Sequence, residues 1–205
     1  MPELRESWAR AWMRIGARAA GDGTCDALLA RYSEPHRKYH TLEHLSECLA
    51  GFESVQGLAA RPGEVEAALW FHDAIYDVRR PDNEERSAEW ARTAAGEGGV
   101  AKDVVERIHS LIMGTKHTGA PAGADEQLMV DIDLAILGSN KERFAEYERQ
   151  IRAEYAHVPD GQFEQRRRAI LQSFLDRPRI YRTAYFHEAL ENAARANLKL
   201  AIDKR

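Results

Sequence analysis

The sequence predicts an all-α protein, a single helical bundle of about eight to ten helices. Apolar residues recur three or four positions apart through nearly all of the 205 residues, which is the spacing of a helix with one buried face. No stretch alternates apolar and polar residues as a half-buried strand does, and no hairpin signal occurs. With 44% apolar residues, the chain can bury a sizeable core at a length typical of one domain. We therefore expect one domain over residues 1–205.

The first half of the chain contains three clear helical patterns. A terminal helix is expected over residues 3–20. Thr41 is placed to cap a second helix, whose apolar residues are Leu42, Leu45, Leu49 and Phe52. A third helix starts near Pro62, and its inward stripe consists of Val65, Ala68, Leu69, His72, Asp73 and Tyr76.

The rest of the chain continues in the same way. Asp82 and Glu85 have the spacing of a capping box, which predicts a helix through Ala95, and a further helix covers residues 104–112. Asn140 is placed to cap the next one. Two more helices are expected around 163–174 and 185–203, with Gly- or Pro-containing breaks at 96–99, 119–123 and 158–161. The segments of chemical interest lie within about 36–138, followed by C-terminal helices over 140–203.

Charge and cysteine content exclude several classes of function. The net charge is -4, and no basic stripe is interleaved with aromatic residues, so a nucleic-acid scaffold is not expected. Cys25 and Cys48 are too few for a disulfide framework and too far apart for a short chelating pair. The N-terminus has no apolar signal core, and no stretch approaches the 18 apolar residues of a membrane span. We expect a cytoplasmic protein that does not enter a membrane.

His72 and Asp73 stand side by side in the apolar segment AALWFHDAIYD, residues 67–77. Burying either polar group alone would cost several kcal/mol. A divalent metal ion would satisfy a neutral imidazole and a carboxylate together. A salt-bridged pair within the core is the alternative.

Six segments together carry a resemblance to a known superfamily: YHTLEHL, FHDAIYD, DNEERSA, DIDLAILG, EYAHVPD and ARANL. They resemble the HD superfamily of metal-dependent phosphohydrolases, and more closely a small bacterial subfamily of predicted hydrolases. The superfamily pattern is one His, then an adjacent His-Asp, then a distant Asp, all on helices of an all-α core. The resemblance extends from about residue 36 to 198 and implies an enzyme that hydrolyses a small phosphate ester, with a nucleotide as one candidate.

The resemblance implies His44, His72 and Asp73 as the first three metal ligands. The fourth is either Asp131 or Asp133, which lie about 200° apart on a helix and so cannot both face one ion. Asp133 shares its face with apolar residues, and we favour it, while Asp131 stays open. Such ligands suit a divalent ion such as Mn, Fe, Co, Ni, Zn or Mg, which would activate water and neutralise a phosphoryl oxygen.

Other charged residues near these segments are candidates for catalysis and substrate binding. Asp77 and Glu84 follow the His-Asp pair and could orient the attacking water or protonate the leaving group. Cationic side chains suit a phosphate, and those flanking the site segments are Arg37, Lys38, Arg79 and Lys116. His40 and His117 are candidates for supporting contacts or a second metal position.

Two alternatives of a different class remain open. One is an oxygenase, because the same superfamily scaffold can hold a di-iron centre. The other is a non-catalytic protein that binds a metal ion or a nucleotide. The sequence leaves the substrate, the metal and the oligomeric state undetermined, since fold resemblance does not specify a substrate.

Overall fold

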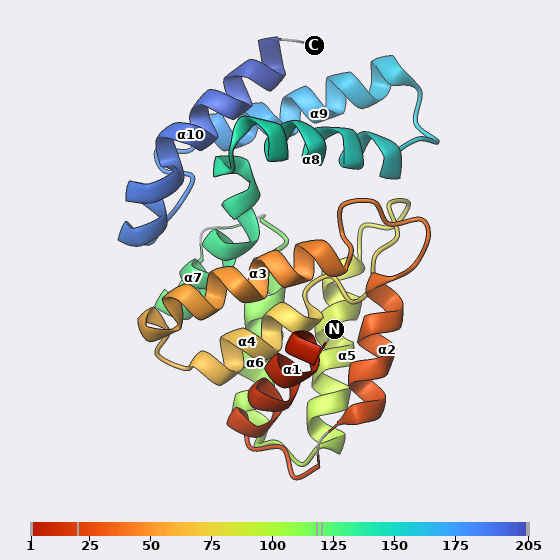
Figure 1. Ribbon diagram of the computed structural model, residues 1–205, viewed down its shortest axis with the longest axis vertical. Helices are drawn as coiled ribbons and strands as arrows, with labels where there is room; N and C mark the ends of the chain where they lie inside the picture. Colours follow the sequence, from red (N-terminus) through yellow and green to blue (C-terminus); the bar gives the residue numbers. More distant parts are fainter. Residues whose placement is uncertain (1, 20, 118, 120, 204–205) are drawn as a thin grey trace. The chain divides into compact units, whose positions relative to one another are not determined.

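The computed structural model describes residues 2–19, 21–117, 119 and 121–203. Over these residues the protein consists of ten α-helices and two short 3₁₀ segments, with no strand (Figure 1). This confirms the predicted all-α class and the number of helices. The helices form two compact units, Met1–Val130 and Asp131–Arg205. None of the described helices has the length and apolar character needed to cross a membrane.

The first unit is arranged around α4. Its elements are α1 (Pro2–Arg14), α2 (Asp22–Tyr32), α3 (Leu42–Val55), η1 (Gln56–Leu58), α4 (Pro62–Phe71), α5 (Asn83–Glu97), α6 (Lys102–Gly114) and the first part of α7 (Ala124–Asp133). Helix α4 packs against α1, α3, α5 and α6, and every residue from Gly63 to Phe71 is buried. The segment that carries the His-Asp pair is therefore held at the centre of this unit.

A buried carboxylate attaches α1 to α4. Glu66 is fully buried and accepts hydrogen bonds from Ser7 at 3.0 Å, from Arg10 at 2.6 Å and from Arg14 at 3.3 Å. Beside these contacts Trp8 stacks on Trp12, with ring centroids 4.6 Å apart. Because the buried charge is paired and hydrogen-bonded, it fixes α1 on α4 without leaving an unsatisfied ion in the core.

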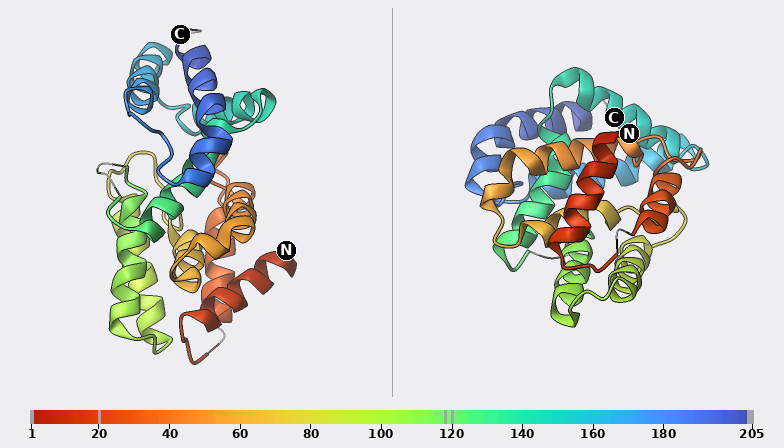
Figure 2. Two further views of the ribbon diagram at one scale, coloured as in Figure 1. Left: turned by 90° about the vertical axis from the view of Figure 1, so that its left-hand side faces the viewer. Right: turned by 60° about the horizontal axis from the view of Figure 1, so that its bottom comes forward.

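The second unit is formed around α10. Its elements are η2 (Leu134–Gly138), α8 (Lys141–Glu154), α9 (Asp160–Leu175) and α10 (Ala184–Asp203), and Figure 2 shows the three long helices gathered in one group. Asn197 of α10 donates to the carbonyls of Leu137 and Ser139, both at 2.9 Å. A Cβ at Gly138 would lie 2.6 Å from the Cβ of Leu190, so only glycine permits this approach.

Two predicted helix starts are confirmed by their caps and one is not. The side chain of Thr41 accepts from the N–H of Glu43, and Asn140 accepts from Arg143. Asp82 precedes α5 as expected, but it makes no capping hydrogen bond. Its carboxylate instead pairs with Arg80, so the predicted capping box is absent.

Two predicted helix ends are wrong. The first helix ends at Arg14 rather than at residue 20, because Gly16 adopts a φ of 83° and the N–H groups of Gly16 and Ala17 close the last turn on the carbonyls of Met13 and Trp12, as in a Schellman motif. Helix α4 ends at Phe71 and does not continue to Tyr76. The His-Asp pair thus lies in the turn directly after the helix.

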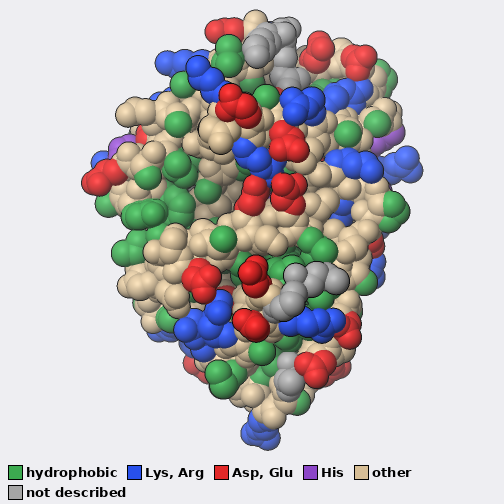
Figure 3. Space-filling view, in the orientation of Figure 1, with side chains coloured by type: hydrophobic (Ala, Val, Ile, Leu, Met, Phe, Trp, Pro, Cys, Tyr) green, Lys and Arg blue, Asp and Glu red, His purple; other side chains and the backbone are tan. Residues whose placement is uncertain are grey.

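Charged residues of both signs share the surface. On the face shown in Figure 3, Lys and Arg side chains lie among Asp and Glu side chains. Within the described residues drawn on that face, they do not gather into a continuous basic area.

Candidate metal centre

Two buried histidines from different helices meet in the first unit. His44 lies in the first turn of α3, and His72 is the residue that follows α4. Their Nε2 atoms are 3.1 Å apart, and the two residues are only 2% and 1% exposed. The packing of α3 against α4 therefore brings the single His and the His-Asp pair of the sequence together, as predicted.

Asp73 adds a carboxylate oxygen to the pair. Its Oδ2 lies 3.3 Å from Nε2 of His44 and 3.1 Å from Nε2 of His72. Ligand atoms about 2.0–2.2 Å from one ion in tetrahedral or octahedral geometry lie about 3.0–3.5 Å from one another. The separations of these three atoms fit a single divalent ion.

The orientation of His72 is set by the backbone of its own helix. Its Nδ1 lies 2.8 Å from the carbonyl oxygen of Leu69, and a carbonyl can only accept, so this nitrogen carries the proton. Without a metal ion, Nε2 of His72 can take a second proton and donate it to Asp73; in the neutral ring the lone pair is on Nε2 and faces His44 and Asp73. A ring N–H donated to a carbonyl is the usual way in which a metal-binding histidine is oriented.

Cys48 joins the cluster, and the sequence analysis missed it. Its Sγ lies 3.7 Å from both ring nitrogens of His44, one turn further along α3. His44, Cys48 and His72 each offer a ligand atom within 4.8 Å of the others. Because Cys25 and Cys48 are far apart in sequence, a site without sulfur was expected. The overlooked signal is the His-x-x-x-Cys spacing, which places both side chains on one helix face.

Two carboxyl groups near the histidines have pKa values shifted in opposite directions. Burial alone would raise the pKa of Asp73, but the charges of His72 and His40 and hydrogen bonds from His44 and His72 outweigh it, and the pKa lies well below its usual range. Burial, together with the negative charge of Asp73, raises the pKa of Glu84. Compared with ordinary carboxyl groups, Asp73 therefore keeps its negative charge more readily and Glu84 keeps a proton more readily.

The two candidates for the fourth ligand have different surroundings, and both belong to the second unit. Asp131 is fully buried, and its carboxylate accepts from the N–H of Arg182 at 2.9 Å, and from the N–H and the hydroxyl of Thr183, both at 2.7 Å. These donors hold the segment that precedes α10. Asp133 is the last residue of α7.

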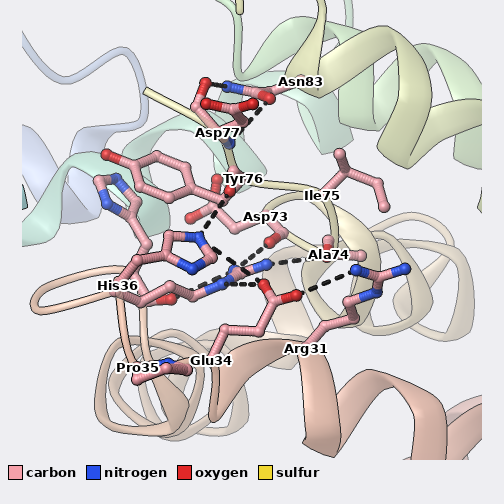
Figure 4. Close-up of polar contacts among 12 residues, drawn as sticks. Arg31, Glu34, Pro35, His36, Asp73, Ala74, Ile75, Tyr76, Asp77 and Asn83 are labelled. Carbon is pink, nitrogen blue, oxygen red and sulfur yellow. Dashed lines mark hydrogen bonds and ion pairs between the residues drawn. The ribbon is translucent and has the colours of Figure 1, made fainter. Parts of the chain in front are cut away.

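Arg37, expected as a phosphate ligand, is 3% exposed. Its guanidinium donates to the carbonyls of Asp73 at 2.6 Å, Ala74 at 2.9 Å and His40 at 3.2 Å, and to the carboxylate of Glu34 at 3.1 Å. Figure 4 shows the loop with Glu34, Pro35 and His36 beside the segment of Asp73, Ala74 and Tyr76, with dashed polar contacts between the two. The donors of Arg37 thus bind the protein's own backbone. The side chain therefore supports the segment that carries Asp73.

The two candidate acids after the His-Asp pair differ in how they are held. The backbone N–H of Asp77 donates to Asn83 at 3.1 Å, and its side chain accepts from the N–H of Arg79 at 2.9 Å, so it shapes the turn before α5. Glu84 lies in the first turn of α5 and is half-buried. Burial and the charge of Asp73 raise the pKa of Glu84.

The remaining cationic candidates lie toward the surface. Lys38 is exposed and donates to the carbonyl of Pro35 at 2.8 Å. Arg79 is also exposed, and Lys116 forms an ion pair with Glu85.

His40 and His117, the candidates for supporting contacts or a second metal position, have different surroundings. The ring of His40 stacks on Tyr76, with centroids 4.0 Å apart. His117 has a backbone φ of 55°, which is uncommon for a residue other than glycine.

Comparison of the chain with protein-family models, with curated proteins and with solved structures found no match. Function must therefore be inferred from the geometry of the site. The buried cluster of His44, Cys48 and His72 could hold a metal ion, which is compatible with a metal-dependent enzyme.

Proposed function

We propose that the protein is a metal-dependent phosphohydrolase of the HD type that cleaves a small phosphate ester. The observation that carries the proposal is the convergence of His44, His72 and Asp73, whose ligand atoms lie 3.1–3.3 Å apart. These are the residues that the resemblance implies as ligands. Two imidazole nitrogens and a carboxylate oxygen form a set suited to a divalent cation, which would take the place of the protons that the two histidines otherwise share with Asp73.

The fourth ligand in this proposal is Asp133. Asp131, the other candidate, already accepts hydrogen bonds on both oxygens, and a metal ion would have to displace these donors. Asp133 lies two residues further on, on the other side of α7.

A bound divalent ion would activate a water molecule and neutralise a phosphoryl oxygen. The residues of the chain would supply proton transfer and charge. Glu84, whose pKa is raised by burial and by Asp73, is suited to protonate the leaving oxygen. We propose Arg79 and Lys116 as the cations for the substrate phosphate: Lys116 would exchange its ion pair with Glu85 for the phosphate, whereas Arg37 is held by several backbone carbonyls.

Phosphate release from a panel of nucleotides and sugar phosphates tests this proposal. The metal-free protein is supplied in turn with Mn²⁺, Co²⁺, Ni²⁺, Zn²⁺ and Mg²⁺, and a chelator should abolish the activity. His72→Ala and Asp73→Ala should lose both bound metal and activity. His157→Ala is the matched control, because His157 is exposed and lies far from the cluster in the sequence.

Each possible failure has a distinct meaning. Full metal occupancy in His72→Ala would contradict the metal centre itself. A protein that binds metal and hydrolyses nothing in the panel would contradict the phosphohydrolase. Oxygen consumption by an iron-loaded form would favour the oxygenase, and loss of the folded state on chelation without any activity would favour a structural metal.

A further inference from the structure

The backbone leaves the helical hydrogen-bond pattern at the two metal ligands that follow α4. This helix ends at Phe71. In a continued helix, the N–H of Asp73 would donate to the carbonyl of Leu69, four residues back. Here that carbonyl lies 2.8 Å from Nδ1 of His72, and the N–H of Asp73 donates to the hydroxyl of Tyr32 at 3.3 Å. The carbonyl that would continue the helix is thereby left to orient the imidazole.

The hydroxyl of Tyr32 bridges the two sides of this break. Besides accepting from Asp73, it donates to the carbonyl of Trp70 at 3.2 Å. In a continued helix, that carbonyl would accept from the N–H of Ala74, which instead donates to the carbonyl of Phe71 at 2.9 Å. One hydroxyl thus pairs a carbonyl and an N–H that the helix no longer pairs.

Tyr32 is itself held firmly. It is the last residue of α2 and is 0% exposed. The guanidinium carbon of Arg37 lies 5.3 Å from its ring centre, and the same guanidinium donates to the carbonyl of Asp73 at 2.6 Å. Asp73 is therefore held at both of its backbone polar groups, at the N–H by Tyr32 and at the carbonyl by Arg37.

We propose that Tyr32 is a positioning residue for both metal ligands that follow α4. By accepting from the N–H of Asp73, its hydroxyl keeps that residue in the turn and leaves the carbonyl of Leu69 to accept from His72. The hydroxyl acts through these residues and is not itself a ligand. The inference rests on the metal centre of the proposed function, but it does not depend on the phosphate-ester substrate.

Tyr32→Phe tests the proposal, because it removes the hydroxyl and keeps the ring. The variant, confirmed as folded by circular dichroism, should bind Zn²⁺ and Co²⁺ about ten- to a hundredfold more weakly, as when other groups that orient a ligand are removed. The visible absorption of its Co²⁺ form should also differ from that of the wild type, because this absorption depends on the ligand geometry.

Tyr147→Phe is the matched control. Tyr147 is also buried, but it lies in α8. The guanidinium carbon of Arg167 lies 5.0 Å from its ring centre, and the side chains of Tyr147 and Arg167 are hydrogen-bonded. This variant should lose stability while keeping the metal affinity and the cobalt spectrum of the wild type.

The effect on His72 can be measured separately by NMR of the zinc-loaded protein. The Nδ1 proton of His72 should exchange slowly with solvent in the wild type and in Tyr147→Phe. It should exchange faster in Tyr32→Phe, because the N–H of Asp73 can then compete for the carbonyl of Leu69. Unchanged exchange of this proton in Tyr32→Phe would overturn the proposed effect on His72.

The outcomes separate this inference from the proposed function. Unchanged zinc affinity in Tyr32→Phe would overturn the role of Tyr32 and leave the metal centre standing. An equal loss in Tyr147→Phe would also overturn it, since that would show a general loosening of the fold. Failure of the wild type to bind any divalent ion would overturn both proposals.

A measurement on the wild type decides the question even if Tyr32→Phe folds poorly. The amide proton of Asp73 should be protected from hydrogen exchange in the metal-free protein, because it is bonded to the buried hydroxyl of Tyr32. Free exchange of this amide would show that the bridge does not form and would overturn the inference.

Discussion

Arg37 is a buried cation that links the two segments carrying the metal ligands. It holds the carbonyls of Asp73 and Ala74 on one side and that of His40 on the other. Its guanidinium carbon also lies 5.3 Å from the ring centre of Tyr32 and 5.6 Å from that of Tyr76. A planar fork with several donors can make these contacts together, and a lysine ammonium cannot.

We expect Arg37→Lys to destabilise the protein and to weaken metal binding. Carbonyls left without a donor should cost about 1–3 kcal/mol, and looser support of Asp73 should reduce metal affinity about tenfold or more. Urea unfolding and metal titration measure the two effects. Arg31→Lys is the control: Arg31 pairs with the same Glu34 but its side chain is 52% exposed, so the change should stay within about 1 kcal/mol. Equal effects of the two substitutions would contradict the role of Arg37.

Glu84 should carry a stability penalty that depends on pH. Because its pKa is raised in the folded protein, the unfolded chain loses this proton first as the pH rises, and folding becomes less favourable through the interval between the two pKa values. In the metal-free protein, Glu84→Gln should therefore raise the melting temperature at pH 7 and change it much less at pH 4. With metal bound, the same variant should lose turnover while keeping its metal. A lower melting temperature at pH 7 would show that the carboxylate is stabilising.

The sequence allowed some of these residues to be identified and not others. His44, His72 and Asp73 were predicted because their order along the chain resembles a known pattern, and the structure brings them together. Cys48 was missed because its neighbour in the cluster is a histidine on the same helix and not a second cysteine. The structural role of Arg37 depends on its contacts with Asp73 and Ala74, which are distant in the sequence. Helical periodicity does not reveal such contacts.

At the scale of secondary-structure elements, Asp131 and Asp133 stand near the end of one helix, and we predict that they have separate tasks. Asp131→Ala removes the acceptor for three donors of Arg182 and Thr183 and should cost about 1–3 kcal/mol of stability, with little change in metal affinity. Asp133→Ala should do the reverse. Thermal unfolding of the metal-free forms and metal titration distinguish them. Loss of metal in Asp131→Ala, with full occupancy in Asp133→Ala, would exchange the assignments.

Helix boundaries show where local sequence signals are sufficient. Thr41 and Asn140 cap their helices through contacts two or three residues away, so both starts were predictable. The end of α4 depends on partners that are distant in the sequence. The N–H of Asp73 donates to the hydroxyl of Tyr32 at 3.3 Å, and Arg37 donates to the carbonyls of Asp73 and Ala74. An apolar stripe that continues to Tyr76 gives no sign of these contacts.

At the scale of the whole molecule, helical periodicity was enough to predict the fold class, because each helix needs only its own apolar stripe. The division into two compact units could not be predicted in the same way. It falls between Val130 and Asp131, within α7, where no Gly- or Pro-rich linker marks it. Compactness depends on contacts between helices, which a single stripe does not specify.

Metal binding should stabilise the protein as a whole, because the ligands come together only in the folded state. His44 lies in α3, and the pair of His72 and Asp73 follows α4. Free metal at a hundred times its dissociation constant adds about 2.7 kcal/mol, which for a chain of this size corresponds to roughly 5–10 °C in melting temperature. Differential scanning fluorimetry with and without chelator should show this shift in the wild type and in His157→Ala, and no shift in His72→Ala. The same increase in all three proteins would mean that the ion binds elsewhere.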